Sequence, residues 1–330
     1  MNAPVRPPGQ QAGPGRRKRR GRGRAEQLMV PDAEFTSYYG RPVIKEPVWE
    51  PVDVPSYLFF GGLAGASSVL AAGSQLSGHP ELARVAKVTA LGAISLSAVA
   101  LIHDLGRPSR FVNMLRVFKP SSPMSVGSWL LAGYGPVAGA AAVSDVTGIL
   151  PAAGTAATLG AALLGPAIAT YTAALICDTA VPSWHEGYRE MPYLFAGSAS
   201  GAAGGLGLLA VRPADAGPAR RLAVAGASVE LVAKQLMMRR LAATPGLESS
   251  RGLAEPYEEG RAGTVLRVAE ILTVTGLAGA VLGRRRRVVS ALAGAALLAA
   301  SALTRYGVFE AGLASARDPK YTIVPQRARR

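Results

Sequence analysis

Apolar residues in this 330-residue chain occur in long runs that are separated by short polar segments. The runs are about 18 to 22 residues long, which is the length a helix needs to cross the hydrocarbon core of a bilayer. Because several such runs follow one another, we predict an all-α integral membrane protein. The pattern gives eight transmembrane helices, at about residues 55–76, 85–105, 126–146, 153–177, 192–211, 219–240, 264–283 and 288–305.

The segment before the first predicted helix has two parts. Residues 1–30 are basic and poor in apolar residues, so we expect a disordered tail. Residues 31–54 carry several aromatic and proline residues and are expected to form an interfacial strap, lying on the end of the helices or on a partner protein. After the last helix, residues 306–330 are expected to form a polar C-terminal tail.

Eight crossings place both termini on one side of the membrane, here called the N face. The net charge of +15 includes the block Arg16–Arg24 (RRKRRGRGR), which favours a cytoplasmic N face and contact with anionic lipid over nucleic-acid binding. The short loops on both faces carry similar numbers of arginines, among them Arg284–Arg287 on the opposite face. We expect an inner-membrane protein with both termini in the cytoplasm and no signal peptide.

The stretch Trp49–Ala66 (WEPVDVPSYLFFGGLAGA) marks the sharpest boundary between polar and apolar sequence. Pro55 suits the first turn of a helix, and Asp53 and Tyr57 lie four residues apart, on one helical face. Small residues follow, which allow another helix to approach closely. A shorter stretch, Trp184–Gly197 (WHEGYREMPYLFAG), repeats the order of Trp, acid, Pro and Tyr-Leu-Phe. Either chance or duplication of a four-helix unit explains this echo.

Polar and aromatic residues gather at the N-face ends of the predicted helices. Each one alone is explained by its place at a membrane interface, but an aromatic belt should occupy both faces. Histidine, tyrosine and carboxylate groups can exchange protons with the carbonyls of a quinone. We therefore predict a quinone site built from Asp53, Tyr57, His103, Asp104, Arg107, Trp129 and His185.

Ionisable residues also occur inside predicted membrane helices. Glu230 lies near the middle of its helix, Lys234 follows one turn later, and Glu270 lies near the start of the next helix. Glu230 and Lys234 are explained either as a structural pair four residues apart or, with Glu270, as stations of a proton path.

The sequence limits other chemistry. Cys177 is the single cysteine, so a disulfide framework and a cysteine-ligated iron–sulfur or zinc site are excluded. His103 and His185 are the only histidines on one face, and a haem between them is a weaker alternative to a haem-free chain. No phosphate-binding glycine loop is present outside the apolar helices.

Four segments together resemble the NrfD family, the membrane subunits of polysulfide reductase-like complexes, over about residues 35–310. They are Trp49–Ala66, His103–Phe111 (HDLGRPSRF), Ser122–Trp129 (SPMSVGSW) and Trp184–Gly197. The resemblance implies a haem-free protein with two four-helix bundles, at 55–177 and 178–305. It implies a menaquinone or ubiquinone site at the mouth of the first bundle, where the family's positions fall on Asp53 and Tyr57. Some relatives carry Asn and His at these two places.

The resemblance also implies partners. Electrons would pass between the quinone and a ferredoxin-like iron–sulfur subunit on the N face, which serves a molybdopterin enzyme of the formate dehydrogenase or polysulfide reductase type. In polysulfide reductase this partner face is periplasmic. The chain would not be catalytic alone and would hold no haem or iron–sulfur cluster. An ion or proton transporter and a membrane anchor without redox role are the alternatives.

Overall fold

The computed structural model describes residues 43–47, 49–107, 109–247 and 251–328. The expected basic tail and the first part of the strap lie outside the described residues. All described residues belong to one compact unit of the chain, and their regular secondary structure is entirely helical.

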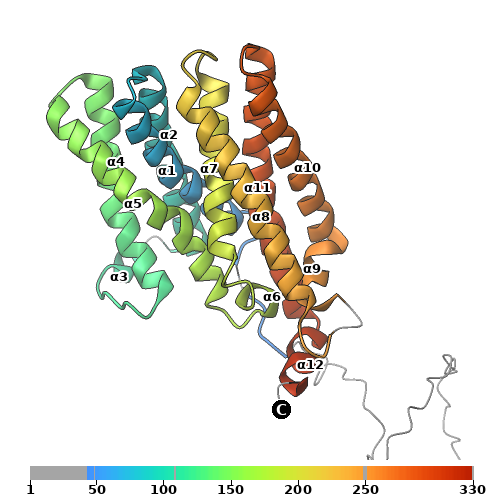
Figure 1. The fold of residues 1–330 in the computed structure, drawn as a ribbon. Coiled ribbons are helices and arrows are strands. Elements are labelled where there is room, and N and C mark those ends of the chain that lie inside the picture. Colours follow the sequence, from blue (N-terminus) through green and yellow to red (C-terminus); the bar gives the residue numbers. More distant parts are fainter. Residues whose placement is uncertain (1–42, 48, 108, 248–250, 329–330) are drawn as a thin grey trace, which may run out of the picture. The chain divides into compact units, whose positions relative to one another are not determined.

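Eight long helices form the described unit, and they lie side by side in Figure 1. They are α1 (Asp53–Leu76), α2 (Pro80–Asp104), α4 (Pro123–Thr147), α5 (Pro151–Cys177), α7 (Met191–Ala210), α8 (Gly217–Ala242), α10 (Gly260–Leu282) and α11 (Arg287–Arg317). The short elements are α3 (Ser109–Met114), α6 (Pro182–His185), η2 (Gly252–Ala254), α9 (Glu255–Glu258) and α12 (Lys320–Ala328). In Figure 1, α3, α6 and α12 lie at the lower end, which is the N face because α1 begins there.

Length and composition identify a multi-pass membrane protein. Seven helices of the described residues are long and apolar enough to span a membrane: α1, α2, α4, α5, α7, α10 and α11. The helix expected at 219–240 is present as α8 and is long enough, but it does not belong to that set. The reason is its polar positions, which include Glu230 and Lys234.

The chain differs from expectation after residue 305, where a polar tail was predicted. Instead, α11 continues to Arg317 and is followed by α12. The continuation is possible because Val308, Phe309 and Leu313 are buried. A buried apolar stripe of this kind stabilises a helix beyond the apolar run that hydropathy detects.

The long helices recur at a constant spacing. α1, α2, α4 and α5 begin at residues 53, 80, 123 and 151, and α7, α8, α10 and α11 begin at residues 191, 217, 260 and 287. The offset between corresponding helices is about 137 residues, as expected for an internal repeat. We call α1–α5 the first half and α7–α11 the second half. The offset matches that between Trp49 and Trp184, so it extends the short sequence echo over both halves.

Small residues set the closest helix contacts in both halves. A Cβ on Gly65 of α1 would lie 2.3 Å from the carbonyl oxygen of Gly165 in α5. In the second half, a Cβ on Gly205 of α7 would lie 2.7 Å from the carbonyl oxygen of Gly294 in α11. Helices can approach this closely only where no side chain intervenes. The first helix of each half thereby packs tightly on the last helix of the same half.

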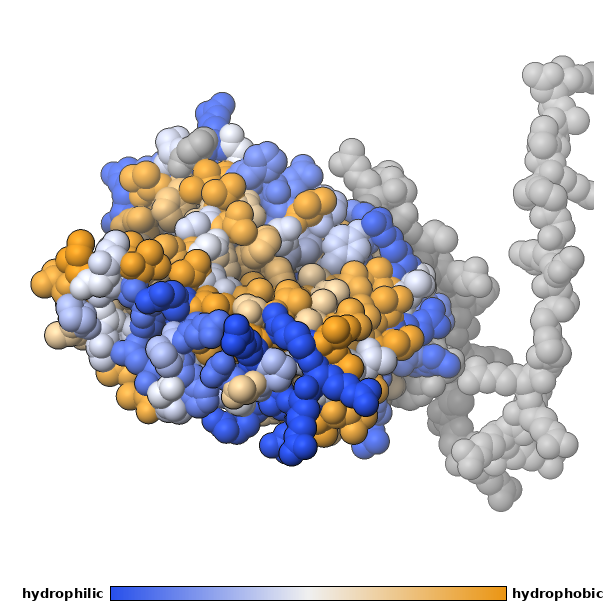
Figure 2. Space-filling view, turned by 90° about the horizontal axis from the view of Figure 1, so that it is seen from above, coloured by the Kyte–Doolittle hydropathy of each residue, from blue (hydrophilic) through white to orange (hydrophobic). Residues whose placement is uncertain are grey.

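The two halves meet along α1 and α7, which contact each other. Leu58 of α1 and Leu194 of α7 occupy matching positions of the repeat, and both are almost completely buried. Figure 2 views the end opposite the N face, where hydrophilic residues (blue) are interspersed with hydrophobic ones (orange).

Candidate functional site

The first helix pair brings a carboxylate and an imidazole together at the N face. α1 begins at Asp53, and α2, which runs in the opposite direction, ends at Asp104. The Nδ1 atom of His103 lies 2.6 Å from Oδ2 of Asp53, so Nδ1–H donates to the carboxylate. The His103 side chain is 77% exposed and that of Asp53 is 17% exposed. The ring is therefore oriented by a partly buried carboxylate while much of its surface stays accessible.

The described part of the strap lies on this helix pair and reaches the second half. The backbone N–H of Glu50 donates to Oδ1 of Asp104 over 3.1 Å. Trp49 stacks on Trp184, with ring centroids 5.7 Å apart. Glu46 forms an ion pair with Arg317 at the end of α11. We call the N-face ends of α1 and α2, with Trp49 and Glu50, the first mouth.

Trp184, on which Trp49 of the strap stacks, is itself held firmly in the second half. Its side chain is fully buried, and its Nε1–H donates to the carbonyl oxygen of Val308 over 2.7 Å. Phe309 completes the aromatic cluster, 5.7 Å from Trp184 and 6.5 Å from Trp49 between ring centroids. The two tryptophans that head the two repeated stretches therefore contact each other directly.

Tyr57 lies one turn inside the first mouth, as its spacing from Asp53 predicts. Its side chain is buried, and its ring contacts that of Tyr171 edge-on, with centroids 6.3 Å apart. The backbone oxygen of Tyr57 accepts a hydrogen bond from Ser97 of α2. Tyr57 is therefore packed against α2 and α5, one turn along α1 from Asp53.

Arg107, Trp129 and His185 form no hydrogen bond or ion pair with Asp53 or His103 among the described residues. Arg107 is exposed, and its guanidinium forms no hydrogen bond with the described residues. Trp129 packs edge-on against Phe118, at 6.3 Å between centroids. His185 ends α6, and its Nδ1 lies 3.1 Å from the carbonyl oxygen of Cys177. It lines a separate pocket against α12.

The second half holds a charged pair at the position that corresponds to Asp53 and His103. Glu190 precedes α7, and Arg240 lies near the end of α8. Both pairs are separated by 50 residues in the sequence. Arg240 Nε lies 2.8 and 3.0 Å from the two carboxylate oxygens of Glu190, and its NH2 also bonds the Glu186 carbonyl. The sequence interpretation missed this pair, although its spacing repeats that of the first.

In the second pair, the cation is Arg240, which contacts more than its carboxylate partner Glu190. Its guanidinium also lies over the ring of Tyr188, 5.8 Å from the centroid. A guanidinium remains protonated under all physiological conditions, whereas an imidazole exchanges its proton near neutral pH. The Asp53–His103 pair can therefore take part in proton exchange. The Glu190–Arg240 pair is a permanently charged ion pair that holds α7 and α8 together.

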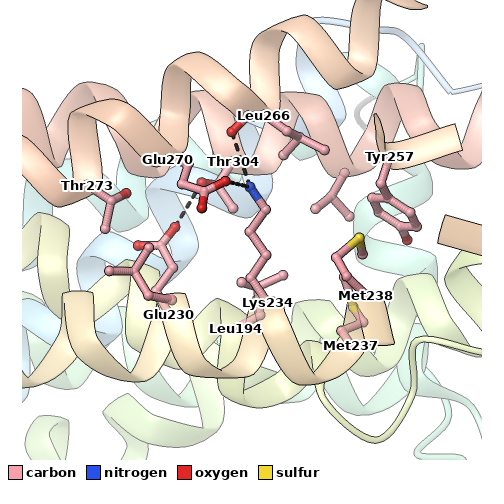
Figure 3. A pocket seen from close by; sticks show the side chains of 12 residues that line it. Leu194, Glu230, Lys234, Met237, Met238, Tyr257, Leu266, Glu270, Thr273 and Thr304 are labelled. Carbon is pink, nitrogen blue, oxygen red and sulfur yellow. Dashed lines mark hydrogen bonds and ion pairs between the residues drawn. The ribbon is translucent and has the colours of Figure 1, made fainter. Parts of the chain in front are cut away.

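Glu230, Lys234 and Glu270 line an inner pocket of the second half, which Figure 3 shows. Glu230 is almost completely buried and accepts a hydrogen bond from Thr304 over 2.8 Å. Lys234 Nζ lies 2.8 Å from Oε2 of Glu270 and 3.3 Å from the Leu266 carbonyl oxygen. Lys234 thus pairs with α10 and not with Glu230 on its own helix. Each of the three side chains is tied to a neighbouring helix.

Arg305 is a buried cation that the sequence interpretation did not single out. It is fully buried in α11, donates from NH2 to the Phe195 carbonyl oxygen over 2.7 Å, and lies over the Phe195 ring. Its Nε and NH1 atoms have no hydrogen-bond partner in the described residues. The signal was present, because an arginine within a predicted membrane helix is rare. It was overlooked because the helix was expected to end there.

No group of three or more His, Cys, Asp or Glu side chains gathers into a metal-binding arrangement in the described ranges.

Comparison with known proteins places the chain in a family. The family described as "Polysulphide reductase, NrfD" matches residues 45–220. The match runs from the strap through the first mouth and α7 into the start of α8, and it includes both repeated stretches. A comparison with the curated proteins gave no match. Because the family match covers more than half of the sequence, the chain belongs to the NrfD family.

Proposed function

We propose that this chain is the quinone-binding membrane subunit of an oxidoreductase complex. It passes electrons between the quinone pool and an iron–sulfur subunit that docks on the N face and serves a molybdopterin enzyme. The observation that carries the proposal is the Asp53–His103 pair at the first mouth. Membership of the NrfD family supports the same role.

The residues at the first mouth fit a quinone head. A quinone carbonyl needs a donor that can also release a proton, and the exposed His103 ring, oriented by Asp53, is such a group. The apolar outer surface of α2, where Leu96 and Val99 are exposed, suits an isoprenoid chain. When bound, the quinone supplies two-electron redox chemistry coupled to proton exchange.

Each residue of the first mouth has a distinct task in this proposal. His103 donates or accepts the proton at the quinone oxygen, and Asp53 holds the ring and balances its charge when it is protonated. The bond from Glu50 fixes Asp104 beside them. Arg107 adds positive charge at the rim, where it favours anionic forms of the bound ring. Tyr57, buried one turn along α1 from Asp53, stays a candidate for contact with the quinone ring.

The quinone is menaquinone or ubiquinone, and Trp129 and His185 remain candidates for contacts at the edge of the site. The protein is proposed to span the inner membrane eight times, with α8 as the eighth crossing, as two four-helix bundles and with both termini in the cytoplasm. The repeated helix spacing supports the two bundles, and the contacts of α8 with α7 and α10 support its crossing.

A transporter role is the second candidate, and it is motivated by the buried Glu230 and the Lys234–Glu270 pair. In the electron-transfer proposal, the same groups form part of a proton path through the second half. The two candidates differ in their need for a partner, since a transporter would move ions in vesicles that contain this chain alone.

The experiment that tests the proposal uses the intact complex from its native membrane. Replacing Asp53 by Asn and His103 by Gln should lower quinone-linked turnover, while the partner's activity with a soluble dye stays unchanged. Asp215→Asn, which removes a carboxylate from the opposite face, is the matched control. If both mouth variants keep wild-type quinone turnover, the assignment of the site to the first mouth is wrong.

A further inference from the structure

A polar groove of about 330 Å³ lies between α8 and α10 in the second half. It adjoins the inner pocket of Figure 3, because Lys234, Leu266 and Glu270 line both. The first mouth does not use this groove, and of its charged lining residues only Lys234 and Glu270 belong to the proposed proton path. Its charged lining residues are Lys234, Arg251, Glu258, Arg267 and Glu270.

The groove is lined by three cationic side chains and two carboxylates, so one cation has no carboxylate partner within the lining. Lys234 pairs with Glu270 at 2.8 Å, and Arg251 pairs with Glu258 at 2.5 Å. Arg267 donates from Nε to the Gly263 carbonyl oxygen over 3.2 Å, and its terminal nitrogens bond no acceptor in the described part of the chain. Among the described residues, no carboxylate pairs with the guanidinium edge that the groove presents.

The groove lies in the N-face half of α8 and α10. Arg267 is about two turns from the N-face start of α10, and Lys234 is about two turns from the N-face end of α8. On α10, apolar side chains are exposed at Val268, Ile271 and Val274. A charged recess beside an apolar membrane-facing surface matches the two chemical parts of a phospholipid.

We propose that this groove binds the phosphate of an anionic phospholipid from the N-face leaflet. The free edge of Arg267 bonds the phosphate, because a guanidinium presents paired donors that match its oxygens. Lys234 and Arg251, which are paired with Glu270 and Glu258, can offer further donors, and the acyl chains lie along the apolar surface of α10. The proposal also accounts for the polar character of α8, whose Lys234 and Gln235 face the groove and not the lipid chains.

The test uses the full-length protein purified in mild detergent. Phosphatidylglycerol is added, and bound lipid is counted by native mass spectrometry while the thermal midpoint is recorded. Phosphatidylglycerol should bind and raise the midpoint. Arg267→Gln should weaken this binding about tenfold, as expected for a lost charged hydrogen bond, and Arg267→Lys should restore part of it. Arg285→Gln, which removes an exposed charge outside the groove, should behave as wild type.

Three results would overturn the proposal. Equal binding of phosphatidylcholine would show that the groove takes any lipid. Equal protection by inorganic phosphate would show an adventitious ion only. Unchanged phosphatidylglycerol binding in Arg267→Gln would remove the residue from the site. Quinone-linked turnover of the complex provides the folding control, since Arg267 lies outside the first mouth and its replacement should leave turnover unchanged.

Discussion

The two charged pairs at matching positions of the repeat predict opposite effects of mutation. Asp53–His103 is exposed on its histidine side, whereas Glu190–Arg240 has side chains that are only 16% and 27% exposed. We expect Arg240→Gln to destabilise the fold and leave the chemistry intact. We expect His103→Gln to do the reverse.

The magnitude for Arg240 follows from its contacts. Its guanidinium bonds both oxygens of Glu190 and the Glu186 carbonyl, so its loss leaves a partly buried carboxylate without a counter-charge. Removing one partner of a fully buried pair costs 3–5 kcal/mol, and an exposed pair contributes about 1 kcal/mol or less. For this intermediate burial we expect a loss of about 2 kcal/mol, given those two limits. His103→Gln should give no measurable loss.

The assay compares unfolding and turnover on the same preparations. Unfolding in a denaturing detergent, followed by circular dichroism, gives the change in free energy for each variant. Quinone-linked turnover is then expressed per folded molecule. Glu190→Gln should reproduce the stability loss of Arg240→Gln, because the same pair is broken. The reasoning is refuted if His103→Gln destabilises the protein as much as Arg240→Gln, or if Arg240→Gln loses turnover per folded molecule.

Three further predictions concern packing, the strap and the buried carboxylate. Gly65→Ala should destabilise the protein by about 2 kcal/mol through overpacking, because its Cβ would meet the Gly165 carbonyl at 2.3 Å, while Gly92→Ala, with open space around it, should be neutral in the same unfolding assay. Trp49→Ala should release the strap, so limited proteolysis before α1 should become faster; an unchanged cleavage rate would contradict the role of the stack on Trp184. Glu230→Gln keeps an acceptor for Thr304 and should fold normally. In vesicles it should reduce proton movement per turnover, and unchanged movement would exclude Glu230 from a proton path.

The helices were predictable because bilayer thickness sets the length of an apolar run. Predicted and observed ends agree within a few residues at Pro151 and Gly148, whereas α2 begins at Pro80 and not at about residue 85. The end of α11 was not predictable in this way, because its last turns are stabilised by tertiary contacts of Val308 and Phe309. Hydropathy detects apolar runs that are long enough to cross a membrane, but it does not detect tertiary contacts that extend a helix.

The candidate site was predictable only in part. Helical spacing places Asp53 and Tyr57 on one face, but it cannot reveal that the hydrogen-bond partner of Asp53 is His103, on the next helix. The same limit applies to Lys234, whose partner is Glu270 on another helix. Pairing between helices depends on their packing, which sequence spacing does not encode. The repeated separation of 50 residues was the one available signal for Glu190–Arg240.

The most direct test of the central claim is electron paramagnetic resonance of the complex purified from its native membrane. The account predicts that reduced iron–sulfur signals co-purify with this chain, that added quinone oxidises them, and that Asp53→Asn and His103→Gln slow this oxidation. A pure chain without an iron–sulfur partner would contradict the account. Signals that quinone oxidises equally fast in wild type and in both variants would contradict the placement of the quinone at the first mouth.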